Sequence, residues 1–218
     1  MTTITLTRRV LGLLLGVFVA QAAVATGAIA APTSAATATA FQVEQRLAAM
    51  RYDVGAVDGV VDDRTSSAVM AFQKVYGLAR TGQLTDGVAA RILATQSAPP
   101  SLVPNGGPSR VEVDLGRQVL FLYEGGALSS ILAVSSGTAA TPTPTGAFRF
   151  YRYDPGWHTS RLGRLYNAVY FYGGYAIHGS ASVPAQPASH GCIRISLASA
   201  EWFPSHVSTS TAVYVLPG

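Results

Sequence analysis

The segment over residues 96–109, QSAPPSLVPNGGPS, divides the chain into two parts with different hydrophobic patterns. It contains four prolines and two glycines and has no periodicity, which is typical of a linker. Before it, apolar residues recur at helical spacing, whereas after it they form short runs separated by glycine, proline and polar residues. We therefore predict a multidomain α and β protein whose domains meet at this segment.

Residues 41–95 predict a small three-helix bundle. Asp63 is expected to cap the second helix, and the third is expected over 84–94. The apolar positions of the first two helices are Val43, Leu47 and Met50, then Ala68, Val69, Phe72 and Tyr76. Residues 31–40 lack large apolar side chains, so we expect a flexible lead-in there.

Residues 110–218 predict a mostly-β domain. One helical segment is expected within it, from Leu197 to about His206, ending near Pro204. Runs typical of strands cover 110–115, 118–124, 128–135, 146–153, 168–172, 175–178 and 211–216.

Residues 1–30 have the layout of a signal peptide. Arg8 and Arg9 precede an apolar run over 10–25, and small residues suitable for cleavage follow. A permanent membrane anchor is the alternative, but the run is shorter than the roughly 20 residues that span a bilayer. We expect an exported protein, periplasmic, cell-wall-associated or extracellular, with no stable membrane span after cleavage.

Charge and cysteine content limit the possible partners and the possible state of the thiol. The formal charge is +4, and two of the arginines belong to the signal peptide, so the mature chain is only weakly basic and no nucleic-acid partner is implied. The single cysteine, Cys192, cannot form an internal disulfide. It is therefore a free thiol or pairs between molecules.

Two histidines bracket this thiol, in Ile177-His178-Gly179 and in Ser189-His190-Gly191-Cys192-Ile193-Arg194. A thiol is mostly protonated at neutral pH, and a nearby imidazole can take its proton and stabilise the thiolate as an ion pair. If 189–195 is extended, His190, Cys192 and Arg194 share one face. Gly191 lacks a Cβ, so its N–H and that of Cys192 could converge on a developing oxyanion.

Three other interpretations use the same residues or their neighbours. Cys192 could be a small buried hydrophobe, as free cysteines usually are. His178, His190 and Cys192 are suitable zinc ligands, but structural sites usually need four and catalytic sites a specific geometry. A glycosidase needs two facing carboxylates, and residues 110–218 contain no recognisable pair.

Both parts of the chain resemble known families. The pattern Ser-His-Gly-Cys-hydrophobic-Arg at 189–194, preceded by Ile-His-Gly at 177–179, resembles the signature of the YkuD-type L,D-transpeptidase catalytic domain. Thr143-Pro144-Thr145-Gly146 is similar to a further segment of that family. Residues 41–95, with Val57-Asp58-Gly59 and Ala71-Phe72-Gln73, resemble a peptidoglycan-binding-1 domain.

The first resemblance implies a YkuD-like β sandwich and an L,D-transpeptidase that forms 3→3 cross-links between peptidoglycan stems through a thioester, releasing D-alanine. By that resemblance Cys192 is acylated, and His178 is the general base, oriented by the Gly179 carbonyl. His190 would support the oxyanion hole. Arg194 would bind a substrate carboxylate, and Ser189 and Tyr175 would lie on the substrate side.

The resemblances also imply partners and leave alternatives open. Peptidoglycan is the expected partner, both its stem tetrapeptides and its glycan strands, with carbapenem-type β-lactams as inhibitors and no metal or organic cofactor. Water could resolve the same acyl-enzyme, which would make the protein an L,D-carboxypeptidase or endopeptidase, and a non-catalytic wall-binding protein is the remaining alternative. Only ten residues separate His178 from Ser189, so we expect a reduced lid.

Overall fold

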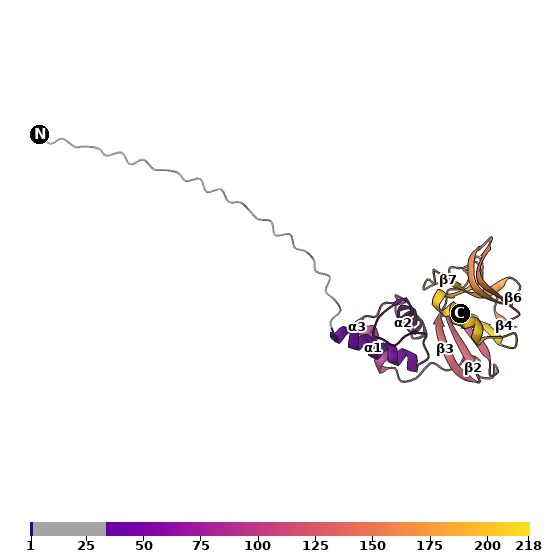
Figure 1. The fold of residues 1–218 in the computed structure, drawn as a ribbon, viewed down its shortest axis with the longest axis horizontal. Coiled ribbons are helices and arrows are strands. Elements are labelled where there is room, and N and C mark those ends of the chain that lie inside the picture. The colour runs from indigo at the N-terminus through magenta and orange to yellow at the C-terminus, as the bar shows by residue number, and fades with distance from the viewer. Residues whose placement is uncertain (2–33) are drawn as a thin grey trace. The chain divides into compact units, whose positions relative to one another are not determined.

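The computed structural model describes Met1 and residues 34–218 (Figure 1). The predicted signal peptide lies outside this range apart from its first residue. Three helices come first, namely α1 (Ser34–Ala49), α2 (Asp63–Val75) and α3 (Asp86–Ala94). In the described part of the chain, no helix is both long and apolar enough to cross a membrane.

The remaining residues form two sheets and a short helical segment (Figure 1). The elements are β1 (Arg110–Asp114), β2 (Val119–Glu124), β3 (Ala127–Ala133), β4 (Gly146–Arg149), β5 (Arg152–Ser160), β6 (Gly163–Tyr172), β7 (Tyr175–Ser180), β8 (Ile193–Ser196), α4 (Leu197–Trp202), the 3₁₀ turn η1 (Phe203–His206) and β9 (Ala212–Leu216). This arrangement confirms the predicted combination of an N-terminal helical region and a mostly-β region with one helical segment.

The sheets have five and four strands. The strand order of the first is β3-β2-β1-β9-β4, in which β9 pairs parallel with β1 and antiparallel with β4. The order of the second is β5-β6-β7-β8, and β7 and β8 run parallel with His178 opposite Arg194. This last pairing places the two sequence motifs on neighbouring strands.

Strand β2 is buried on both faces, which explains its uninterrupted apolar sequence. Leu120 and Leu122 belong to the core between the two sheets. Val119, Phe121 and Tyr123 point the other way and share a second core with the helices. The helical region therefore packs directly on this sheet.

The segment over 96–109 connects the two regions in an ordered conformation. Buried Glu112 accepts hydrogen bonds from the Ser101 hydroxyl and the Leu102 N–H, both at 2.7 Å. The Arg110 guanidinium donates to the Gly107 carbonyl at 2.7 Å and pairs with Glu112 at the same distance. These bonds satisfy backbone groups that proline-rich segments leave without partners.

Two expectations about helix starts were wrong. The cap of α2 is Asp62 rather than Asp63, because the Asp62 carboxylate accepts the N–H groups of Arg64 and Thr65. Helix α1 begins at Ser34, so the described part of the expected flexible lead-in is helical. Alanine has the highest helix propensity, and Ala40 packs at 5% exposure, so small side chains favoured a helix here.

The strand predictions found only the open end of the long hairpin formed by β5 and β6, because the predicted run over 168–172 is the second half of β6. The predicted run over 146–153 divides into β4 and the start of β5. Strand β5 then passes through Pro155 and Gly156, where the pairing with β6 shifts, and the Asn167 side chain accepts the Gly156 N–H at 2.7 Å. This bulge explains why a segment with proline and glycine still forms a strand.

Candidate active site

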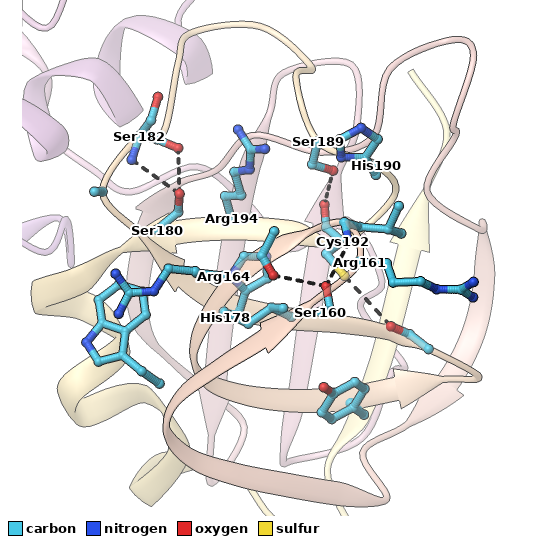
Figure 2. Close-up of a pocket in the computed structure, with 17 residues that line it drawn as sticks. Ser160, Arg161, Arg164, His178, Ser180, Ser182, Ser189, His190, Cys192 and Arg194 are labelled. Carbon is cyan, nitrogen blue, oxygen red and sulfur yellow. Dashed lines mark hydrogen bonds between the residues drawn. The ribbon is translucent and has the colours of Figure 1, made fainter.

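A cavity of about 580 Å³ opens beside β6, β7 and β8 (Figure 2). It brings together five predicted site residues, namely Cys192, His178, His190, Arg194 and Ser189. Three others, Gly179, Gly191 and Tyr175, do not line it but support residues that do.

Cys192 lies immediately before β8 and is only partly exposed. Extending the β7–β8 register by one residue places it beside Ala176, with His178 and Arg194 next along the same face. Its side chain packs on a small apolar cluster that contains Tyr170 and Ala176. The strand pairing thus brings thiol, imidazole and guanidinium to one cavity.

The condition that residues 189–195 are extended is met only in their second half, which belongs to β8. Residues 190–192 form a bend, and Gly191 has a φ of +114°, in the region that favours glycine. The Ser189 hydroxyl accepts the Gly191 N–H at 3.0 Å and donates to the Cys192 carbonyl. The Ser189 side chain therefore holds the bend and is not free for a substrate.

The two histidines have different environments. His178 is 5% exposed, and its Nδ1 lies 2.9 Å from the Gly179 carbonyl. A carbonyl only accepts, so Nδ1 carries the proton and Nε2 remains free to accept one. His190 is exposed and has no hydrogen-bond partner in the described structure. This geometry favours His178 as a base.

Burial disfavours the charged forms of His178 and Cys192. It raises the pKa of the Cys192 thiol, against the opposing effects of the Ala176 N–H and the Arg194 charge. It lowers the pKa of His178, and the positive charge of Arg194 acts in the same direction. No hydrogen bond joins them in the described structure, and the Cys192 Sγ lies 3.8 Å from the Gly174 carbonyl. The expected resting ion pair is therefore not supported, because burial disfavours both charges.

The raised pKa of Cys192 predicts how the reactivity of its thiol changes with pH. The alkylation rate of Cys192 by iodoacetamide should keep rising past about pH 8.5, the ordinary thiol pKa, because only the thiolate reacts. Arg194→Gln should move the rise to higher pH, because the lost positive charge favoured the thiolate. Mass spectrometry of the intact protein at a series of pH values measures the rate. A rate that is already constant from about pH 6 would indicate a resting ion pair instead.

Backbone groups around Gly191 are arranged by Thr143. Its hydroxyl donates to the Gly191 carbonyl at 2.7 Å and accepts the Gly137 N–H at 2.9 Å. Because the Gly191 N–H is bonded to Ser189, the expected pair of oxyanion donors is incomplete at rest. The Cys192 N–H has no partner in the described residues and is free to donate to a developing oxyanion.

Comparison with known proteins gives the family. The family model of the L,D-transpeptidase catalytic domain (YkuD) matches residues 108–215, and that of a putative peptidoglycan binding domain matches residues 40–92. A crystal structure of an L,D-transpeptidase from Xylanimonas cellulosilytica is similar at 34% identity and a TM-score of 0.72, covering 81% of this chain and 92% of that one. The chain belongs to the L,D-transpeptidase family.

A second L,D-transpeptidase, from Stackebrandtia nassauensis, shares the fold at 23% identity and a TM-score of 0.50. That comparison covers 81% of this chain and 89% of the other. A search of curated proteins gave no match.

One wall of the L,D-transpeptidase cavity was not predicted. It comes from the β5–β6 hairpin, whose tip contributes Ser160, Arg161 and Leu162 (Figure 2). Trp157 and Arg164 flank the tip, and the guanidinium of Arg164 lies 4.2 Å from the centre of the Trp157 ring. The sequence signal was the turn-forming Ser-Arg-Leu-Gly at 160–163, which the proline and glycine of β5 obscured.

Tyr175 was expected on the substrate side of this L,D-transpeptidase, but it does not line the cavity. Its ring packs against Gly191, so that a Cβ at position 191 would come within 2.5 Å of the Tyr175 Cε1. Tyr170 is the tyrosine that lines the cavity. In a strand, neighbouring side chains alternate between faces, and Tyr175 therefore supports the bend from behind.

The zinc alternative finds no geometric support in this L,D-transpeptidase. Within residues 34–218, no group of three or more histidine, cysteine or acidic side chains comes close enough together to hold a metal ion.

Proposed function

We propose that this member of the family is a cysteine-dependent enzyme that forms 3→3 cross-links between peptidoglycan stem peptides. The observation that carries the proposal is the buried His178, with Nδ1 bonded to Gly179, in the same cavity as the only thiol of the chain. A base with a free Nε2 next to a thiol is the arrangement needed for nucleophilic acyl transfer.

In the first half-reaction the Cys192 sulfur attacks the carbonyl of the third residue of a donor tetrapeptide while His178 Nε2 takes the thiol proton. The Cys192 N–H stabilises the oxyanion. The bond to the terminal D-alanine then breaks, and His178 returns the proton to the leaving amine. A thioester and free D-alanine result.

In the second half-reaction an amine on the third residue of a neighbouring stem attacks the thioester. His178 takes a proton from this amine and returns it to the departing sulfur, so the enzyme is regenerated. If water attacks instead, the products are those of an L,D-carboxypeptidase, so this activity competes at the same acyl-enzyme.

Arg194 is suited to binding a donor carboxylate. Its guanidinium lines the cavity and has no carboxylate partner among the described residues. We expect Arg194→Ala to raise the KM for the donor about 10- to 100-fold while changing kcat less, because a lost charged hydrogen bond costs about 1.5–3 kcal/mol. Initial rates at varied donor concentration measure both constants. An unchanged KM would remove this role from Arg194.

Peptidoglycan is the proposed partner of both regions. The helical region matches a putative peptidoglycan binding domain, which supports binding of glycan strands near the catalytic cavity. The signal-peptide layout of residues 1–30 supports export to the cell wall, where these substrates occur.

The direct test is mass spectrometry of the products formed from disaccharide-tetrapeptide fragments. Dimers linked 3→3 support the proposal. Tripeptide without dimers would indicate a carboxypeptidase, and unchanged substrate would indicate a non-catalytic wall-binding protein. A mass increase on Cys192 after incubation with the carbapenem imipenem would independently support formation of an acyl-enzyme.

A further inference from the structure

The helical region contributes one buried lysine to the segment that follows β3. Lys74 of α2 is 1% exposed, and its Nζ donates to the carbonyl of Val134 at 2.8 Å. No carboxylate pairs with it in the described part of the chain. Burial, and then the positive charge of Arg80, lowers the pKa of Lys74 to about 7. Burying a lysine without a carboxylate partner costs free energy, so this position needs an explanation.

Val134 begins a segment that runs along the loop carrying Cys192. We call residues 134–138 the strap and residues 188–194 the cysteine loop. Ser135 exchanges two backbone hydrogen bonds with Arg194, of 3.1 and 3.0 Å. The Ser136 carbonyl accepts the N–H groups of Ala188 and Ser189, each at 2.9 Å. The strap therefore follows the cysteine loop on both sides of Cys192.

The strap is fixed to the sheet along its length. The Gln118 side chain accepts the Ser136 N–H and donates to the Ser136 hydroxyl, both at 2.7 Å. The Gly137 N–H donates to Thr143, which also binds the Gly191 carbonyl. At the start of the strap, the Val134 carbonyl has the Lys74 ammonium as its side-chain partner. Removing that donor leaves a buried carbonyl unsatisfied.

We propose that Lys74 is a positioning residue for acyl transfer, which fixes Val134 and, through the strap, holds the cysteine loop that carries the Cys192 N–H. The inference rests on the proposed function. It assigns the helical region a part in catalysis in addition to any binding of peptidoglycan.

The test compares two reactions of the same thiol in the full chain. Acylation of Cys192 by imipenem develops an oxyanion, whereas alkylation by iodoacetamide does not, so a misplaced N–H slows only the first reaction. Both rates can be followed by mass spectrometry of the intact protein. Thermal unfolding shows whether each variant is folded at the assay temperature.

Lys74→Met keeps the length of the side chain and removes its donor. We expect it to slow acylation about tenfold and to change alkylation less than about twofold. Lys74→Gln retains an N–H donor and should recover part of the loss. Arg46→Met is the matched control, because Arg46 of the helical region also donates to a backbone carbonyl, that of Thr95 at 2.6 Å, and its partners Thr95 and Gln96 lie outside the strap. Its acylation rate should equal that of the wild type.

Several results would overturn the inference. Equal acylation rates in Lys74→Met and wild type would show that the contact does not affect the reaction. A matching change in alkylation, or an equal loss in Arg46→Met, would indicate general loosening of the structure. Unfolding of both Lys74 variants would make Lys74 a folding residue only. Absence of an imipenem adduct in the wild type would instead contradict the proposed function itself.

Discussion

Cys192→Ala is expected to abolish 3→3 cross-linking and the release of D-alanine, lowering turnover by about 10⁴-fold or more. The chain has a single cysteine, so no other thiol can replace it. The fold should persist, because the change removes one atom from a partly exposed side chain, which costs about 1 kcal/mol. Product analysis by mass spectrometry and thermal unfolding measure the two effects.

Cys192→Ser is the matched control for the loss of the sulfur. It keeps the size and polarity of the side chain, but the hydroxyl is a much weaker nucleophile at neutral pH. We expect it to be as stable as the wild type and nearly inactive. Substantial turnover by either variant would mean that Cys192 is not the nucleophile.

Gly191→Ala is expected to reduce acylation of Cys192 by about 100-fold or more. The φ of +114° is strained for alanine, and its Cβ would lie 2.5 Å from the Tyr175 ring. The backbone at residue 191 has little freedom to relieve this strain, because Thr143 binds the Gly191 carbonyl and Ser189 binds the Gly191 N–H. The bend would have to shift, and the Cys192 N–H would move with it. Imipenem acylation followed by mass spectrometry measures the loss.

Gly174→Ala provides the control at a neighbouring cavity residue. A Cβ there would meet no atom within 4 Å. Its acylation rate should remain within about twofold of the wild type. The double variant Gly191→Ala/Tyr175→Ala removes the clash but not the backbone strain, so it should recover only part of the loss. A fully active Gly191→Ala would contradict the assigned role of the bend.

The sequence predicted the helices and strands better than the packing around them and their irregularities. Helical spacing located α2 and α3, and the apolar run of β2 was read as a strand. That run gives no sign of what covers each face, because burial between two sheets and burial under helices select the same residues. The bulge in β5 was missed because Pro155 and Gly156 usually end a strand, and here Asn167 compensates for them.

The motif residues could be found from sequence, but not their protonation or their contacts. Cys192 and His178 were identified by residue type and spacing. The directions of their pKa shifts depend on burial, which the motif does not encode. Likewise, the occupation of the Gly191 N–H by Ser189 depends on a bend that the motif does not indicate.

The two-sided burial of β2 has a practical consequence for shortened versions of this protein. A chain that begins at residue 108 would keep every catalytic motif, yet it would uncover the row Val119, Phe121 and Tyr123, with Ile131 and Ala133 beside it. An apolar sheet face of this kind promotes aggregation in water. Low solubility of such a fragment would therefore reflect a missing partner surface and would say nothing about the chemistry of Cys192.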